Sequence, residues 1–155
     1  LLSSGPVVDA LLASAALPAV FPPVRIGDRY LLDGMVASHT PISAAVSAGA
    51  SRIIVLPTGH ACSLAQPPKG ALALALHALN LIIAHQIATG VERYEKHADL
   101  IVVPPLCPLA IPSHDFSQTD ALIARATAAT GQWLEQGGLE IRGVPLPLRP
   151  HHHEG

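Results

Sequence analysis

The sequence predicts an α/β fold, because helical and strand-forming patterns alternate along the chain. A helical stretch over residues 42–48 ends at Gly49, and the apolar run 52–56 follows it directly. A helix, a glycine and a short apolar run in this order are typical of a helix that leads into a buried parallel strand. A long helix over 71–96 and a short strand over 100–103 repeat the same order.

The N-terminal elements are expected to be shorter. Pro6 suits the first position of a helix, where a missing N–H costs nothing, and Pro18 ends that helix. Two short strands, 24–26 and 30–33, flank a glycine-aspartate turn of the kind that closes β-hairpins. The helical residues expected to face the core are Val8, Leu11, Leu12 and Ala15.

The C-terminal part is predicted to hold one more helix and a tail. The helix covers 119–136 and ends at Gly137. Residues 146–155 contain two prolines and a run of histidines, and we expect them to form a flexible tail. No linker divides the remainder, so residues 1–145 are interpreted as part of a single domain.

Composition excludes several functions. Of the 155 residues, 50% are hydrophobic and 13% are charged, with a net charge of -2, so no basic surface exists to hold nucleic acid or an anionic membrane. Lipid would be met through apolar contacts, which allows transient contact with a membrane surface. Cys62 and Cys107 lack metal-ligand spacing and are interpreted as reduced packing residues, although a disulfide between them stays open.

The apolar helix over 71–96 approaches the length of a membrane span. Polar residues interrupt it, so we favour a buried scaffold helix. Two of them, His77 and His85, are eight residues apart and lie on roughly one helix face. Metal ligands on a helix more often sit four residues apart, so these histidines are interpreted as hydrogen-bonded rather than metal-bound.

The most informative segment joins an aspartate-glycine pair to a proline-rich helix end. Carboxylates that follow a strand and precede glycine often bring chemistry to the edge of an α/β sheet. Here Asp33 and Gly34 follow two leucines. Upstream, residues 13–23 read Ala-Ser-x-Ala-x-Pro-x-x-Phe-x-Pro, and downstream come Pro41 and the segment Ala-x-x-x-Gly-Ala over 45–50.

This ordered pattern resembles the patatin-like lipid acyl hydrolases over residues 1 to about 60, the C-terminal half of that domain. The resemblance implies a three-layer α/β/α hydrolase fold, of which this chain holds the C-terminal portion. It also implies a Ser-Asp dyad without histidine, in which Asp33 is the base and Gly34 the turn residue beside it. Such a dyad needs no metal and no organic cofactor. Apolar residues near the aspartate would line an acyl pocket with Gly34, namely Leu17, Val20, Phe21 and Met35.

Three residues deserve separate interpretation. The family usually has glycine or alanine at the position of Met35, and tends to have asparagine at the position of His39. We interpret His39 as a hydrogen-bonding brace of the loop rather than as a catalytic base. Ser14 is expected to pack tightly near the floor of the site, with its hydroxyl bonded to backbone.

The nucleophile of the expected dyad is missing from the printed sequence. No Gly-x-Ser-x-Gly occurs, and no glycine-rich oxyanion loop is present. We expect a partial chain, whose partner is the missing N-terminal half of the same domain, and whose substrate is a lipid or small ester. No signal peptide is visible. The compartment stays open, with a cytoplasmic location favoured. The alternative is a non-catalytic α/β domain that binds a lipid or a partner chain, whereas a Rossmann-type nucleotide site is disfavoured because Gly-x-Gly-x-x-Gly is absent.

Overall fold

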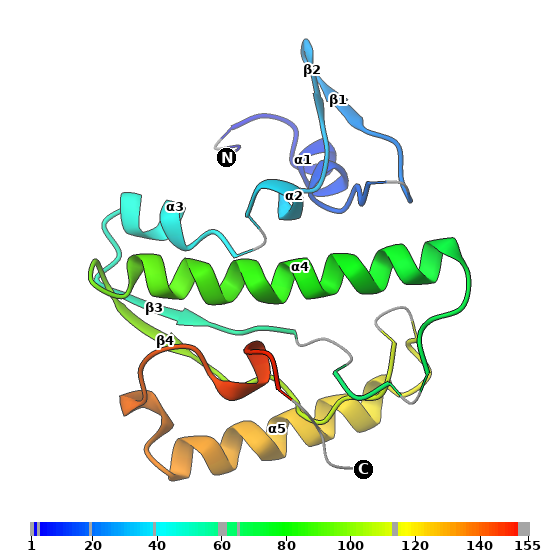
Figure 1. Cartoon of the computed structure of the whole chain (residues 1–155). Helices are drawn as coiled ribbons and strands as arrows, with labels where there is room; N and C mark the ends of the chain where they lie inside the picture. Colours follow the sequence, from blue (N-terminus) through cyan, green and yellow to red (C-terminus); the bar gives the residue numbers. More distant parts are fainter. Residues whose placement is uncertain are drawn as a thin grey trace. The chain divides into compact units, whose positions relative to one another are not determined.

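The computed structural model describes residues 2, 4–18, 20–38, 40–58, 62–64, 66–112 and 115–151. The chain divides into two units: an N-terminal unit, residues 1–39, and a C-terminal unit, residues 40–155. Figure 1 shows the elements of both units along the chain.

The N-terminal unit is a helix with a β-hairpin and a short second helix. Its elements are α1 (Val7–Ser14), β1 (Val24–Ile26), β2 (Arg29–Leu31) and α2 (Met35–Ser38). The strands pair antiparallel, with Val24 opposite Leu31, and the turn between them places Gly27 at a φ of 60°, in the left-handed region that favours glycine. The predicted hairpin is therefore confirmed, although β2 ends two residues earlier than expected and α2 was not predicted.

The buried face of α1 differs from the predicted one. The residues expected in the core are exposed: Val8 by 68%, Leu11 by 66% and Leu12 by 56%, and Ala15 is exposed as well. The small residues Ala13 and Ala16 are buried instead. Within the described part of this unit α1 contacts the three-residue strand β1, and the leucines of the helix stay exposed.

The C-terminal unit confirms the predicted alternation of helices and strands. Strand β3 (Arg52–Val55) pairs in parallel with β4 (Asp99–Val102), and the register places Arg52 opposite Asp99. The helices are α3 (Ile42–Ser47), α4 (Ala71–Tyr94) and α5 (Thr119–Glu135), each within two residues of its predicted bounds. Each sheet of the described residues has two strands.

One apolar core holds the C-terminal unit together. Val91 of α4 is fully buried, and Ile42 of α3 lies beside Gly90. A Cβ added to Gly90 would lie 3.4 Å from Cδ1 of Ile42, so the glycine allows α3 and α4 to approach closely. The remaining members of the core come from both strands, from α4 and from the C-terminal segment: Val55, Ala84, Ile87, Leu100, Val102, Val144 and Leu148.

Helices α4 and α5 lie on opposite sides of strands β3 and β4 in the view of Figure 1. The predicted strand at 52–56 is only partly buried, because Ile54 is 51% and Leu56 72% exposed. By length and composition α4 could cross a membrane, with a mean hydropathy of 1.7, but core helices of soluble proteins meet the same criterion. Of its 24 residues, Ala84, Ile87 and Val91 are buried, and only 17% of its apolar window is buried, so the prediction of a buried scaffold helix is not confirmed.

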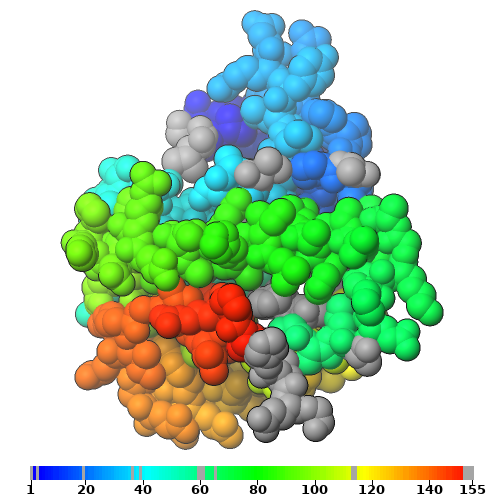
Figure 2. Space-filling model, viewed as in Figure 1, coloured from blue at the N-terminus to red at the C-terminus, as the bar shows by residue number. Residues whose placement is uncertain are grey.

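The segment after α5 corrects the expected flexible tail as far as His151, whereas residues 152–155 lie outside the described residues. It forms two 3₁₀ turns, η1 (Gly138–Glu140) and η2 (Leu146–Leu148), and Leu148 is 5% exposed in the core. Figure 2 shows this red segment against the green surface of α4, in agreement with the contacts between η2 and α4. Burial of Leu148 therefore anchors a segment that its prolines alone suggested would be mobile.

A cluster of charges joins the first residue of β4 to two arginines. Asp99 accepts a hydrogen bond from Nε of Arg52 at 2.8 Å and forms an ion pair with Nε of Arg142 at 2.6 Å. The hydrogen bond from Arg52, helped by the charge of Arg142, holds the pKa of Asp99 below its ordinary value of 3.8. Partial exposure of all three side chains limits what these pairs add to stability.

Candidate functional site

Asp33 lies in the turn between β2 and α2. Its Oδ1 accepts a hydrogen bond of 2.9 Å from the backbone N–H of Met35, which is an Asx turn. Among the described residues no partner is found for Oδ2. The half-buried carboxylate therefore has one oxygen fixed by the backbone and a second oxygen available to another group.

The backbone of Asp33 is tied to the end of α1. Its N–H donates a hydrogen bond of 3.1 Å to the carbonyl oxygen of Ala16. Ala16 is 2% exposed, so a larger side chain would meet its neighbours at this point. The small residues of the Ala-Ser-x-Ala-x-Pro segment thus have a physical role, because they let the chain after β2 approach the helix end.

Asp33 does not occupy the position that strand-end carboxylates take in a parallel sheet. The parallel strands β3 and β4 belong to the C-terminal unit, whereas Asp33 follows the antiparallel hairpin of the N-terminal unit. The prediction of a strand-end aspartate is wrong in this respect, because β2 ends at Leu31 and the carboxylate sits in the following turn.

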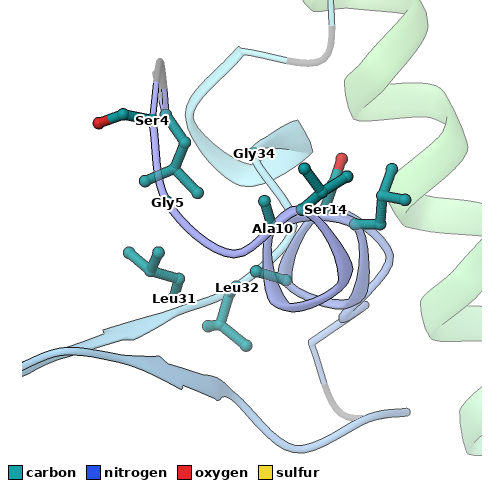
Figure 3. A pocket seen from close by; sticks show the side chains of 11 residues that line it. Ser4, Gly5, Ala10, Ser14, Leu31, Leu32 and Gly34 are labelled. Atoms are coloured by element: carbon teal, nitrogen blue, oxygen red, sulfur yellow. The ribbon is translucent and has the colours of Figure 1, made fainter.

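A hollow of about 610 Å³ lies beside this turn (Figure 3). Gly34, the residue after Asp33, lines it together with Leu31 and Leu32. Helix α1 contributes Leu11 and the segment before it contributes Gly5. The described lining contains no charged side chain and is mostly aliphatic: Leu2, Ser4, Gly5, Val7, Ala10, Leu11, Ala13, Ser14, Leu31, Leu32 and Gly34.

The predicted acyl-pocket residues are only partly brought together. Gly34 lines the hollow, whereas Leu17 and Met35 are half-buried outside the lining. Val20 and Phe21 are 41% and 55% exposed and are also not part of it. Sequence proximity to Asp33 selected these residues, but the chain turns away from the hollow after α1 and again after Gly34.

Sequence reasoning missed the leucines that do line the hollow. The sequence pattern predicts Leu11 in the core, Leu31 within a strand and Leu32 within the same strand, with no role at a site. The signal was present in the apolar residues of α1, of which Leu11 lines the hollow. An apolar helix face opposite an apolar strand end can line a hollow as well as a core, and the residue pattern does not distinguish the two.

Two further predictions concern polar residues near Asp33. Ser14 lines the hollow and is exposed, and no hydrogen bond of its hydroxyl is found within the described part of the chain. The prediction of a tightly packed Ser14 bonded to backbone is therefore wrong, because the helix buries its Ala13 face instead. His39 lies outside the described residues.

The two cysteines of the C-terminal unit are neighbours rather than isolated thiols. Their Sγ atoms are 3.8 Å apart, and they remain thiols. Burial, and then the adjacent Cys62 thiol, raise the pKa of Cys107 to about 11. Spacing in the sequence could not reveal this pair, since 45 residues separate the two positions.

A comparison with known families matches part of the chain. The sequence model of the patatin-like phospholipase family matches residues 1–46. The matched stretch covers the whole N-terminal unit, including Asp33 and the hollow, and ends inside α3. It is shorter than the stretch to residue 60 over which the motifs resemble that family, and it indicates a lipid hydrolase.

Proposed function

We propose that this chain carries the aspartate-bearing part of a patatin-like lipid acyl hydrolase, in which Asp33 is the base of a Ser-Asp dyad. The observation that carries the proposal is the family match over residues 1–46, which contains the Asp33-Gly34 pair. The serine would come from a segment upstream of the printed sequence, because no Gly-x-Ser-x-Gly occurs within it. The chain would then hold the C-terminal portion of a three-layer α/β/α domain.

The geometry of Asp33 is suited to a general base. The Met35 N–H fixes Oδ1, so the orientation of the carboxylate is set before a substrate binds. Oδ2 would then accept the proton of the serine hydroxyl while the serine oxygen attacks the ester carbonyl. A base must lie within hydrogen-bond reach of the proton that it takes, and a fixed carboxylate meets that requirement at little entropic cost.

The hollow beside Gly34 favours an apolar acyl group as substrate. Its volume of about 610 Å³ falls within the range of ~300–1,000 Å³ that is typical of small-molecule sites. Leu11, Leu31 and Leu32 would contact the chain of a fatty acyl ester, and the described lining of the hollow holds no cation for a charged headgroup. Reaction by this dyad would need neither a metal nor an organic cofactor.

A second candidate function is a non-catalytic domain that binds a lipid or a partner chain. Exposed apolar residues on α1 favour it, since Val7 and Val8 are 70% and 68% exposed beside the leucines of the same helix. Exposed apolar surfaces of this kind often mark binding sites.

The test compares the protein translated together with its upstream coding sequence against the 155-residue chain. A fluorophosphonate probe should label a serine of the longer protein and none of the shorter chain. The longer protein should also hydrolyse a p-nitrophenyl fatty acyl ester, and the 155-residue chain should not. If the longer protein binds lipid but is neither labelled nor active, the non-catalytic function replaces the enzyme.

A further inference from the structure

Three potential metal ligands from distant parts of the sequence meet in the C-terminal unit. Sγ of Cys62 lies 3.8 Å from Sγ of Cys107, which in turn lies 3.3 Å from Nε2 of His151. All three ligand atoms lie within 4.8 Å of one another, and all three residues are half-buried. We propose that Cys62, Cys107 and His151 bind one Zn²⁺ ion, as three protein ligands of a tetrahedral site.

The distances suit zinc. Bonds of about 2.3 Å to sulfur and about 2.0–2.1 Å to nitrogen place two ligand sulfurs about 3.8 Å apart in a tetrahedron, and a sulfur and a nitrogen about 3.6 Å apart. The observed 3.8 Å and 3.3 Å are close to these edges. Two thiolates and one imidazole form a soft donor set that excludes Mg²⁺ and Ca²⁺, which prefer oxygen.

The histidine is oriented as a ligand. Nδ1 of His151 lies 2.7 Å from the carbonyl oxygen of Arg149, and a carbonyl can only accept, so Nδ1 carries the hydrogen. In the neutral ring Nε2 then holds the lone pair, and Nε2 is the nitrogen that faces Cys107. Histidine ligands of metals commonly donate their other N–H to a carbonyl or carboxylate in this way.

The loops that carry the cysteines are joined by two backbone groups. The N–H of Leu109 donates to Sγ of Cys62 at 3.3 Å, and the N–H of Ser63 donates to the carbonyl of Leu109 at 3.2 Å. These bonds hold Cys62 beside the loop of Cys107 and place a donor on a sulfur that becomes negative when zinc binds. Each coordinated thiol loses its proton to solvent as the Zn–S bond forms.

A zinc ion at this site would link the segment after η2 to the loops that follow β3 and β4. Cys62 follows β3 and Cys107 follows β4, the two parallel strands, whereas His151 follows η2, whose Leu148 lies in the core. A disulfide is the alternative interpretation of the Cys62–Cys107 pair. It would join the two sulfurs but would not explain why Nε2 of His151 faces Cys107.

The experiment titrates the reduced, chelator-treated 155-residue chain with Co²⁺ in the absence of oxygen. One Co²⁺ per chain should give a thiolate-to-cobalt charge-transfer band and the intense visible bands of tetrahedral cobalt, and Zn²⁺ should remove both. Cys62→Ser, Cys107→Ser and His151→Gln should each weaken binding at least about tenfold, since loss of even an outer-shell partner costs about 10–100-fold.

Two matched controls should keep the bands. One is His85→Gln, an exposed histidine of α4, and the other replaces His152 and His153 of the C-terminal histidine run by glutamine. Zn²⁺ should also protect both thiols of the unaltered chain from alkylation, a readout that does not depend on whether a variant folds.

Undiminished binding by the Cys62→Ser/Cys107→Ser double variant would assign the metal to the histidine run and overturn the proposal. A Cys62–Cys107 disulfide that forms in air despite saturating Zn²⁺, with no cobalt band in the reduced chain, would overturn it in favour of a redox pair.

Discussion

The backbone N–H of Asp33 donates a hydrogen bond of 3.1 Å to the carbonyl oxygen of Ala16, and this bond joins the turn after β2 to the end of α1. It connects the two halves of the sequence motif, the small-residue segment and the aspartate-glycine pair. The position of the carboxylate therefore depends on how closely the chain can pass the helix end. Ala16, at 2% exposed, permits that approach.

Enlarging Ala16 should displace Asp33. Ala16→Leu adds three carbons at a buried position, and overpacking of this kind costs about 1–3 kcal/mol of the free energy of unfolding. The exposed neighbour Ala15 supplies the matched control, and Ala15→Leu should leave stability nearly unchanged. Urea unfolding of both variants measures the difference. Equal stabilities would show that the contact at Ala16 does not set the packing of this turn.

Asp33→Asn separates catalysis from turn formation. The asparagine side-chain oxygen can still accept the Met35 N–H, so the Asx turn and thermal stability should survive. The base is lost, and kcat of the protein with its upstream segment should fall by about 10²–10⁴. Asp28→Asn, in the exposed hairpin turn, is the control and should keep full activity. If Asp33→Asn keeps a kcat close to that of the wild type, Asp33 serves only to form the turn and is not the base.

The alternation of elements could be read from the sequence because local signals and tertiary structure agree. Pro41 and Gly49 bracket α3, and Gly49 adopts a φ of 86° that favours glycine. The hairpin followed from its glycine-aspartate turn in the same way. These residues act through backbone conformation, which depends little on what packs against them.

The burial of α1 and the cysteine cluster could not be predicted, because both depend on distant parts of the chain. Nothing within α1 shows that Ala13 is buried while Leu11 and Leu12 are exposed. Cys107 and His151 are 44 residues apart and meet only because β4 and η2 pack into one core. Spacing rules detect ligands that share a helix or loop, and these ligands share neither.

His39→Asn tests whether a histidine assists the dyad. His39 lies six residues after Asp33, at a position where the resembling family tends to have asparagine. If His39 only braces the loop, the variant should keep kcat within about tenfold, whereas loss of a base would cost about as much as Asp33→Asn. Steady-state kinetics, with circular dichroism as the check on folding, decides between them. A collapse of kcat in a folded variant would transfer the role of base to His39.

Acid should weaken the C-terminal unit through Asp99. Because Arg52 and Arg142 hold its folded-state pKa below 3.8, the carboxylate is favoured in the folded state. Its stabilising contribution is fully present above pH 3.8 and is lost as the pH falls through the lower, folded-state pKa. Asp99→Asn should therefore be less stable than wild type at neutral pH, and the difference should shrink as the pH falls below 3.8.

Urea unfolding of both proteins between neutral and strongly acid pH measures this difference. Added salt should narrow the gap at neutral pH, since the side chain of Arg52 is 68% exposed and screening reaches it. Asp28→Asn is again the control, because Asp28 is fully exposed and lies 3.9 Å from Arg25, and it should follow wild type across the range. A constant gap between Asp99→Asn and wild type at every pH would mean that the pair acts through hydrogen-bond geometry rather than through charge.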